Sequence, residues 1–326
     1  MDEILRIEDL RVSYRERDRT VRAVDGVDFA LRHGSTLAIV GESGCGKTTI
    51  ALSILNLVPR PGHIDTGRII YGDRDLLTLP GEELRRLRGR SISMIFQDPI
   101  GGLNPVMTIG SQVEEIVRTH LATPKNEAKR LSIEALRAQR LSEPERVAAS
   151  FPFQLSGGMC QRVMIAIATV MRPSVIIADE PTSALDVTVQ AAILQELQDL
   201  RDGLGAGIIL ITHDLGVVAQ VADEVAVMYA GRIVEHGATS DVYARPQHPY
   251  TAALMAARPR LDDPGRRIQP IRGVPPDLSS LTGACAFLPR CPKVVNACRN
   301  DAWPALRETA PAHAAACYNP MFHAEA

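Results

Sequence analysis

The sequence predicts an α/β fold built on a largely parallel sheet. Short β-branched runs, each followed by a turn or a helix start, recur at Thr36–Val40, Ser91–Phe96, Val175–Ala178, Ile208–Thr212 and Glu224–Tyr229. Helical stretches lie between them, for example Thr48–Leu57 and Met159–Met171. Continuous apolar runs that alternate with helices are typical of buried parallel strands. A glycine-rich turn between the first run and the first helix is the third observation that favours this class.

The flanking segments have different patterns. Leu5–Tyr14 and Val21–Leu31 alternate apolar and polar residues, which favours an antiparallel β subdomain. Residues 109–149 are rich in Glu, Lys, Arg, Leu and Ala without a strand pattern, so we expect a helical subdomain at about 100–172. After about Arg245, Pro and Ala become frequent and strand patterns fade. We therefore expect one main domain over 1–245 and a C-terminal extension over 246–326.

Composition narrows the possible partners. The 326 residues carry a net charge of −2 with a pI near 6.5, so no global basic field attracts nucleic acid or an anionic membrane surface. The start, MDEILRIEDL, is acidic and lacks the pattern of a secretory signal, which favours a cytoplasmic location. The longest apolar runs fall far short of the roughly 20 residues that cross a bilayer. If the protein works at a membrane, we expect other chains to span it.

The strongest motif is GESGCGKT, Gly41–Thr48, which satisfies the P-loop pattern between a predicted strand and a predicted helix. The glycines let backbone amides surround a polyphosphate, and the helix N-terminus adds favourable partial charge. Lys47 is expected to reach the β- and γ-phosphates and Thr48 to bind magnesium. The residues expected to bind nucleotide here are Gly41, Glu42, Ser43, Gly44, Cys45, Gly46, Lys47, Thr48 and Thr49.

A second motif supplies carboxylates. Val175–Glu180, VIIADE, is a predicted buried strand that ends in Asp179 and Glu180. This is the arrangement that places Asp179 on magnesium and Glu180 beside the water that attacks a phosphate. A lone pair of acids after a strand is more often a solvated strand end, but the upstream P-loop favours the catalytic interpretation.

Several further motifs resemble those of the nucleotide-binding subunit of ABC transporters. They are LSGGM at Leu155–Met159 followed by Gln161 and Arg162, Gln97 in FQDP, SALD at Ser183–Asp186, His213 in ITHD, and the aromatic Tyr14. The resemblance covers the chain from about residue 4 to its end and implies a P-loop NTPase of ABC type. Taken singly, SGG is more often a turn than an anion site, Tyr14 is more often a packing residue, and His213 is about equally often a strand-end residue. In this order and spacing, their joint occurrence by chance is small.

The resemblance implies a role for each motif. Tyr14 would stack on adenine, Gln97 would bind and sense magnesium, and His213 would contact the γ-phosphate. Ser156, Gly157 and Gly158 would cap ATP bound by another subunit, which implies a head-to-tail pair with two nucleotides. Met159 stands where the family usually has glutamine; this removes a polar contact, and we expect activity to survive.

Two segments indicate which group of ABC transporters the chain resembles. FQDPIGGLNP at Phe96–Pro105 and RPQHPYTAALMAARP at Arg245–Pro259 resemble the dipeptide and oligopeptide importers, a group that includes nickel and glutathione uptake systems. The resemblance implies two transmembrane permease subunits, a second ABC ATPase (heterodimer rather than homodimer), an extracytoplasmic peptide-binding protein and a peripheral place on the inner membrane. A soluble ABC ATPase acting on nucleic acid shares every nucleotide motif, but no basic arm is evident.

Four cysteines occur in the extension: Cys285, Cys291, Cys298 and Cys317. In a cytoplasmic chain they favour metal ligation or free thiols over disulfides, and four thiolates suit zinc or an iron–sulfur cluster. No tight zinc knuckle occurs, and CAFLPRCPKVVNAC resembles the tail of oligopeptide-importer ATPases, which implies a [4Fe-4S] cluster. Cys45 and Cys160 are expected to be small packing residues, with Cys45 open to oxidation.

Overall fold

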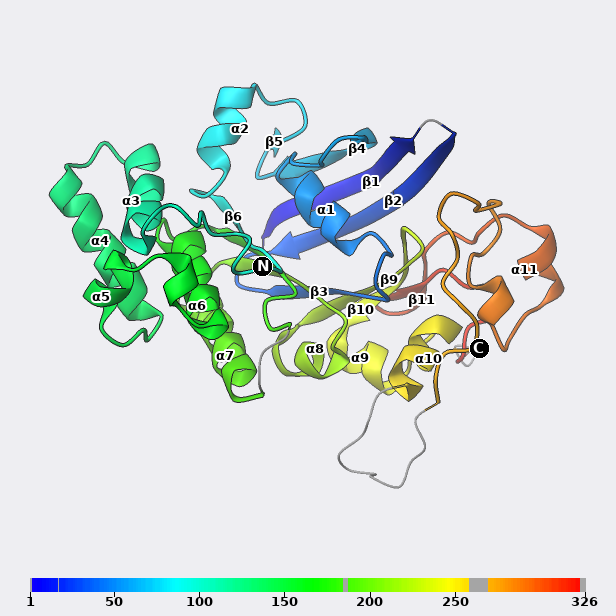
Figure 1. Ribbon diagram of the computed structural model, residues 1–326. Helices are drawn as coiled ribbons and strands as arrows, with labels where there is room; N and C mark the ends of the chain where they lie inside the picture. Colours follow the sequence, from blue (N-terminus) through cyan, green and yellow to red (C-terminus); the bar gives the residue numbers. More distant parts are fainter. Residues whose placement is uncertain (1, 17, 184–186, 258–268, 323–326) are drawn as a thin grey trace. The chain divides into compact units, whose positions relative to one another are not determined.

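The computed structural model describes residues 2–16, 18–183, 187–257 and 269–322 (Figure 1). The chain forms two compact units, each assembled from three stretches of sequence. The first unit comprises Met1–Leu5, Leu31–Thr36 and Tyr71–Ile211, and the second comprises Arg6–Ala30, Leu37–Ile70 and Thr212–Ala326. Among the described residues, no helix has both the length and the apolar character needed to cross a membrane.

The sheet of the first unit is parallel, as the apolar runs predict. Strand β7 (Val175–Asp179) lies between β6 (Ile92–Ile95) and β8 (Gly207–Thr212) and pairs in parallel with both. Every residue of these three strands is buried, which matches the apolar, β-branched sequence. Helix α7 (Val187–Leu204) connects β7 to β8. The same unit contains β5 (Arg74–Asp75) and α2 (Gly81–Leu87).

The predicted helical insertion is confirmed, and its helices group together (Figure 1). They are α3 (Ile109–His120), α4 (Lys125–Ala138), α5 (Pro144–Ala149), the 3-10 turn η1 (Pro152–Gln154) and α6 (Gly157–Thr169). Helix α3 buries Ile109, Val113 and Val117, which share one face at helical spacing. This apolar face packs against α4, α5 and α6.

The second unit contains two sheets. One has the order β11-β12-β10-β9-β3, in which β9 (Glu224–Tyr229) pairs in parallel with β3 (Thr36–Val40) and antiparallel with β10 (Arg232–Ala238). The other places β1 (Glu3–Glu16) between β2 (Arg19–Arg32) and β4 (Gly62–Tyr71). Only two residues separate β1 from β2, and such a connection joins antiparallel strands. The antiparallel prediction for the opening segment therefore holds.

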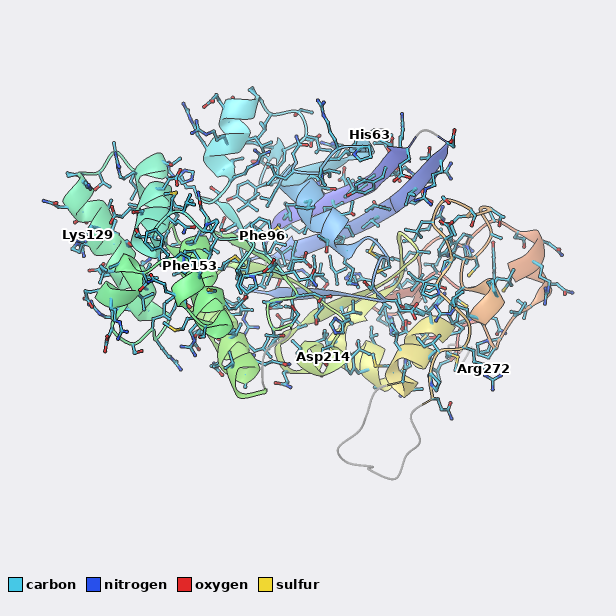
Figure 2. All side chains as sticks on the ribbon, viewed as in Figure 1. His63, Phe96, Lys129, Phe153, Asp214 and Arg272 are labelled. Atoms are coloured by element: carbon cyan, nitrogen blue, oxygen red, sulfur yellow. The ribbon has the colours of Figure 1, made fainter. Side chains whose placement is uncertain are left out.

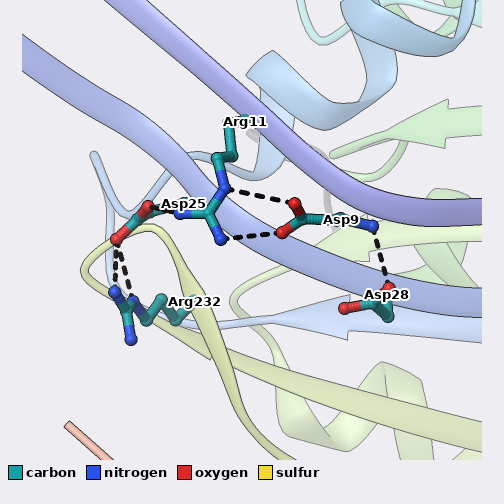
Figure 3. Close-up of polar contacts among 5 residues, drawn as sticks. All are labelled: Asp9, Arg11, Asp25, Asp28 and Arg232. Carbon is teal, nitrogen blue, oxygen red and sulfur yellow. Dashed lines mark hydrogen bonds and ion pairs between the residues drawn. The ribbon is translucent and has the colours of Figure 1, made fainter. Parts of the chain in front are cut away.

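An ion-pair bridge joins these sheets (Figure 3). Asp25 on β2 accepts from Arg11 on β1 at 2.6 Å through one carboxylate oxygen and from Arg232 on β10 at 2.6 Å through the other. The Arg232 guanidinium also lies 4.8 Å from the centre of the Trp303 ring. The C-terminal segment, meaning the residues after Arg245, is thereby connected to strands β1 and β2.

Two strands in the C-terminal segment were not expected from the sequence. β12 (His313–Ala315) pairs with β10, and β11 (Arg307–Ala310) pairs with β12. Both are short and contain little besides Ala and polar residues, so they lack the β-branched run that marks the other strands. The remaining helices of the unit are α1 (Lys47–Ile54), α8 (Leu215–Val221), α9 (Thr239–Ala244), α10 (Pro249–Ala256), η2 (Leu288–Arg290) and α11 (Asn296–Asn300).

The C-terminal segment also shares a hydrophobic core with the central strands of the second unit. The Phe287 ring lies 5.3 Å from Tyr229 on β9 and 5.4 Å from Tyr250 on α10, centre to centre. Trp303 and Ala286 belong to the same buried cluster as Val225 and Val227. The residues after Arg245 therefore fold against the residues before it.

Candidate functional site

Two glycines of the P-loop occupy positions that leave no room for a Cβ atom. Gly46, immediately before α1, has φ +106°, and a Cβ atom there would lie 2.0 Å from the Ala23 carbonyl oxygen. Gly41, immediately after β3, has φ +156°, and its Cβ atom would lie 2.2 Å from the Met228 carbonyl oxygen. Any larger residue would displace the loop from the strands beneath it. The exposed part of the loop is the tip at Ser43 and Gly44.

Lys47 lies against its own loop. Its Nζ atom donates to the carbonyl oxygens of Gly41 at 2.9 Å and Glu42 at 3.0 Å, and the residue is 6% exposed. Thr48 is exposed on the first turn of α1. A cation, an exposed hydroxyl and the amides at a helix start therefore occur together, which is the chemistry that binds a polyphosphate.

Tyr14 lies beside this loop. Its hydroxyl is 3.5 Å from the Thr49 hydroxyl, and a Cβ atom on Gly62 would come within 2.6 Å of its ring. The second unit thus brings the predicted adenine-binding residue to the helix that carries the P-loop. The stacking of its ring on adenine stays a prediction.

Cys45 and Cys160 are both buried, in agreement with their predicted packing role. Burial raises the pKa of each thiol, so the reactive thiolate is disfavoured at both positions. The Cys160 thiol lies 3.6 Å from the Pro152 carbonyl oxygen, to which it donates.

The first unit brings together two of the predicted catalytic residues. The Gln97 side-chain amide donates to the Glu180 carboxylate at 3.1 Å. Glu180 has φ +46°, and its N–H donates to Ile211 on β8 at 2.8 Å. This backbone conformation, uncommon for a residue other than glycine, turns the chain at the end of β7. Asp179 occupies the last position of that strand and is 2% exposed.

Ser183 closes the turn after Glu180, since its hydroxyl donates to the Glu180 carbonyl oxygen at 3.0 Å. Of the predicted SALD motif, residues Ala184, Leu185 and Asp186 lie outside the described residues. His213 follows β8 and is exposed, and the next residue, Asp214, caps α8 by accepting from the Gly216 N–H at 2.6 Å (Figure 2).

The predicted signature forms the start of α6. Ser156 is its N-cap, and the Ser156 hydroxyl accepts from the Met159 N–H at 3.3 Å. Gly157 is exposed, and a Cβ atom there would meet nothing within 4 Å. Gln161 is 2% exposed, while Arg162 donates to the Gln139 carbonyl oxygen at 2.9 Å. The N-terminus of α6 is therefore open on the side of Ser156 and Gly157, as anion binding requires.

Apolar side chains are exposed after β6 in the same unit. Phe96 is 40% exposed, Ile100 58% and Val106 81%. Figure 2 labels Phe96, together with Phe153, which is 73% exposed just before α6. Exposed apolar side chains that recur along one segment are typical of a surface that another protein covers.

Two residues that contact the P-loop were missed by the sequence analysis. The Glu42 N–H donates to the Tyr250 hydroxyl at 2.9 Å, and Arg290 donates to both oxygens of the Glu42 carboxylate at 2.6 and 2.9 Å. Both lie more than 200 positions along the chain from Glu42. No local sequence pattern predicts such a contact, because it forms only when the C-terminal segment folds back onto the P-loop.

The four cysteines of the extension line one small cavity, together with His248 and Phe287. The Lys293 N–H donates to the Cys291 sulfur and the Asn319 N–H to the Cys317 sulfur, both at 3.4 Å. Burial raises the pKa of the Cys285 and Cys317 thiols to about 11 and lowers the pKa of His248 to about 3. Across the described residues, no group of three or more His, Cys, Asp or Glu is arranged to hold a metal ion.

Comparison with known families gives two matches. Residues 24–183 match the family described as "ABC transporter", and residues 234–298 match "Oligopeptide/dipeptide transporter, C-terminal region". The second match includes Cys285, Cys291 and Cys298 but ends before Cys317.

Individual proteins agree with these matches. The chain is 46% identical over 319 residues to a probable peptide ABC transporter ATP-binding protein, y4tR, of Sinorhizobium fredii, covering 97% of this chain and 95% of that protein. It is 46% identical to the dipeptide transport ATP-binding protein DppD of Bacillus subtilis, covering 91% and 89%, and 45% identical to the oligopeptide transport ATP-binding protein OppD of Salmonella typhimurium, covering 98% and 94%.

Solved structures agree as well. The ATP-binding cassette MJ0796, in a dimeric post-hydrolysis state bound to ADP and phosphate, superimposes with a TM-score of 0.66 at 27% identity. The match covers 72% of this chain and 98% of that one. A cbiO1 cassette from Clostridium perfringens, part of the transporter complex cbiONQ, gives a TM-score of 0.63 at 30% identity over 75% of this chain and 92% of that one.

Proposed function

Because the chain belongs to the ABC transporter family, within the group of oligopeptide and dipeptide importers, we propose that its ATP hydrolysis powers the uptake of dipeptides or oligopeptides across the cytoplasmic membrane. One observation carries this function: ATP-binding proteins of peptide importers match nearly the whole chain at 45–46% identity, extension included. The groups of the P-loop supply the phosphate-binding chemistry that ATP hydrolysis requires. The extension over 246–326 then completes a nucleotide-binding domain over 1–245.

Hydrolysis proceeds by in-line attack of water on the γ-phosphate. Glu180 polarises the water, and its hydrogen bond with Gln97 orients the carboxylate. Lys47 leaves the loop carbonyls that it contacts and neutralises charge on the β- and γ-phosphates. Thr48, Asp179 and Gln97 would hold a magnesium ion, which would supply charge neutralisation and orient the phosphates. His213 contacts the γ-phosphate, and Tyr14 stacks on the adenine.

The open N-terminus of α6 acts on a second nucleotide. Ser156, Gly157 and Gly158 present a hydroxyl and backbone amides, and a chain's own ATP lies on its P-loop. As the resemblance to ABC transporter subunits implies, these groups close over ATP bound by a second ABC ATPase. We propose a head-to-tail dimer, with a different ATPase as the partner rather than a second copy.

Two transmembrane permease subunits complete the transporter, and an extracytoplasmic binding protein delivers the peptide. The exposed apolar side chains of Phe96, Ile100 and Val106 favour this segment as the place where the permeases dock. The chain then lies peripherally on the cytoplasmic face of the inner membrane.

The transporter assignment is tested by purifying the tagged chain from detergent-solubilised membranes. We expect two multi-span proteins and a second ATPase to co-purify, and a peptide-loaded binding protein to stimulate ATP hydrolysis by the reconstituted complex. Recovery of salt-sensitive RNA or DNA in place of membrane proteins would contradict the proposal. Stimulation by nickel- or glutathione-loaded binding protein, with none by peptide, would contradict the peptide cargo alone.

We further propose that Cys285, Cys291, Cys298 and Cys317 bind a [4Fe-4S] cluster, for which their sulfurs must shift from the arrangement that the described residues show. Four thiols line one cavity, and backbone N–H groups already donate to two of the sulfurs, as is common around cluster ligands. When bound, the cluster supplies a rigid cross-link among segments that share little regular structure. Because burial raises the pKa of the Cys285 and Cys317 thiols, loading releases protons and is favoured at higher pH.

Anaerobic purification tests the cluster. We expect a brown protein with broad absorbance near about 400 nm, the general property of such clusters, and about four iron atoms per chain. Replacing Cys291 by Ser should remove most of the colour, whereas Cys160→Ser, at a buried thiol outside the cavity, should keep it. A colourless preparation with one zinc per chain, or with no metal, would contradict the proposal.

A further inference from the structure

The ion pair between Arg290 and Glu42 joins the C-terminal segment to the P-loop. The Arg290 side chain is only 4% exposed, while that of Glu42 is 24% exposed. Two guanidinium nitrogens donate to the two carboxylate oxygens, and this pairing raises the pKa of Arg290. Such a bidentate pair sets both the direction and the distance of the carboxylate.

Arg290 is itself fixed by other groups of the same unit. Its Nε atom donates to the Arg272 carbonyl oxygen at 2.9 Å, and its Nη1 atom also donates to the Tyr229 hydroxyl at 3.2 Å. The guanidinium lies 5.9 Å from the centres of both the Tyr229 and the Phe287 rings. The guanidinium is therefore held in place by the core of the second unit.

Glu42 is held at three points. Arg290 binds its carboxylate, Tyr250 accepts from its N–H at 2.9 Å, and Lys47 donates to its carbonyl oxygen at 3.0 Å. Of the three, only the lysine belongs to the P-loop. The amides that follow Glu42 must converge on the phosphates, so the orientation of this residue decides where they point.

The charge of Glu42 gives the ion pair a second effect. A carboxylate at the second position of a phosphate-binding loop has the same sign as its ligand, and like charges at short range repel. The Arg290 guanidinium neutralises this charge where the carboxylate is partly removed from water. Loss of Arg290 would both release the loop and leave a negative charge beside the phosphates.

We propose that Arg290 is a positioning residue for ATP, which acts through Glu42 to hold the P-loop ready for the β- and γ-phosphates. This inference rests on the proposed function, because it requires ATP on this loop. The C-terminal segment then contributes directly to nucleotide affinity. Since Cys291 follows Arg290 in the chain, the cysteine cavity and the P-loop are connected through a single side chain.

The test measures the Kd of ATP for the full-length chain and four variants, namely Arg290→Met, Arg290→Lys, Glu42→Gln and the double variant that combines Glu42→Gln with Arg290→Met. Arg290→Met is expected to raise the Kd roughly tenfold, since one partner of a largely buried charge pair is lost. Arg290→Lys, which keeps the charge but not the bidentate geometry, should give an intermediate Kd. In a Glu42→Gln background, Arg290→Met should change the Kd less than about twofold, because the residue through which it acts is already altered.

Two controls separate positioning from a structural role. AMP lacks the β- and γ-phosphates, so its Kd should be the same for Arg290→Met and the unaltered chain. Arg232→Met removes another arginine–carboxylate bridge of the same unit, with Asp25 as partner, and should lower the Tm without changing the Kd of ATP (Figure 3).

Several outcomes would overturn the inference. They are an ATP Kd within about twofold of the unaltered chain for folded Arg290→Met, or an equal effect of this substitution in both backgrounds. If Arg290→Met does not fold, an unchanged Kd for Arg290→Lys overturns it as well. An unaltered chain that binds no ATP would refute the proposed function itself, whereas normal binding by the unaltered chain and all variants would refute only the role of Arg290.

Discussion

Glu180→Gln is expected to reduce the rate of ATP hydrolysis by about 100- to 10,000-fold while ATP still binds. Glutamine has nearly the same shape, and its carbonyl oxygen can still accept the hydrogen bond from Gln97 that measures 3.1 Å in the structure. What is lost is the negative charge that draws a proton from the attacking water. The rate of phosphate release and the amount of ATP retained after gel filtration measure the two effects separately.

Glu145→Gln is the matched control, because Glu145 is an exposed carboxylate of the same unit that pairs with Arg137 at 2.8 Å. Exposed ion pairs of this kind contribute little, so its turnover should equal that of the unaltered chain. Unchanged turnover in Glu180→Gln would refute the assignment of Glu180 as the residue that polarises water. A loss of ATP binding in this variant would instead point to a role in holding the nucleotide.

Lys47→Ala is expected to weaken ATP binding by roughly 10- to 100-fold and to abolish measurable turnover, since charge-assisted hydrogen bonds to phosphate are lost. Among the described residues, the hydrogen bonds of the Lys47 ammonium all go to groups of its own loop, including two carbonyl oxygens at 2.9 and 3.0 Å. These carbonyl oxygens can be solvated when the ammonium is removed, so the fold should tolerate the change. Titration with ATP and thermal unfolding together measure both consequences.

Lys129→Ala serves as its control, because Lys129 is an exposed lysine on α4 in the other unit (Figure 2). Its ATP affinity and Tm should match those of the unaltered chain. If Lys47→Ala binds ATP as tightly as the unaltered chain, the nucleotide does not lie on the P-loop and the proposed site is wrong.

The elements that the sequence predicted share one property: each is specified by residues close together in the chain. Strands β3 and β9 have the bounds predicted from their β-branched runs, and the glycines of the P-loop occupy the positive φ angles that its pattern requires. The Ser156 cap is equally local, because its hydroxyl accepts from an N–H three residues later. Short-range backbone chemistry of this kind can be read without knowing the fold.

Tertiary structure alone decided the remaining features. Strands β11 and β12 have no β-branched run. They form because β12 pairs with the edge of β10, and β11 in turn pairs with β12. The four cysteines line one cavity only after their segment, which includes Phe287, folds back to His248. The hydrogen bonds that Arg290 and Tyr250 form with Glu42 join residues more than 200 positions apart in the chain. The sequence by itself determined the groups that carry the phosphate chemistry, because their function depends on local backbone geometry. Only the folded chain decided which distant side chains hold those groups in place, because such contacts depend on which surfaces pack together.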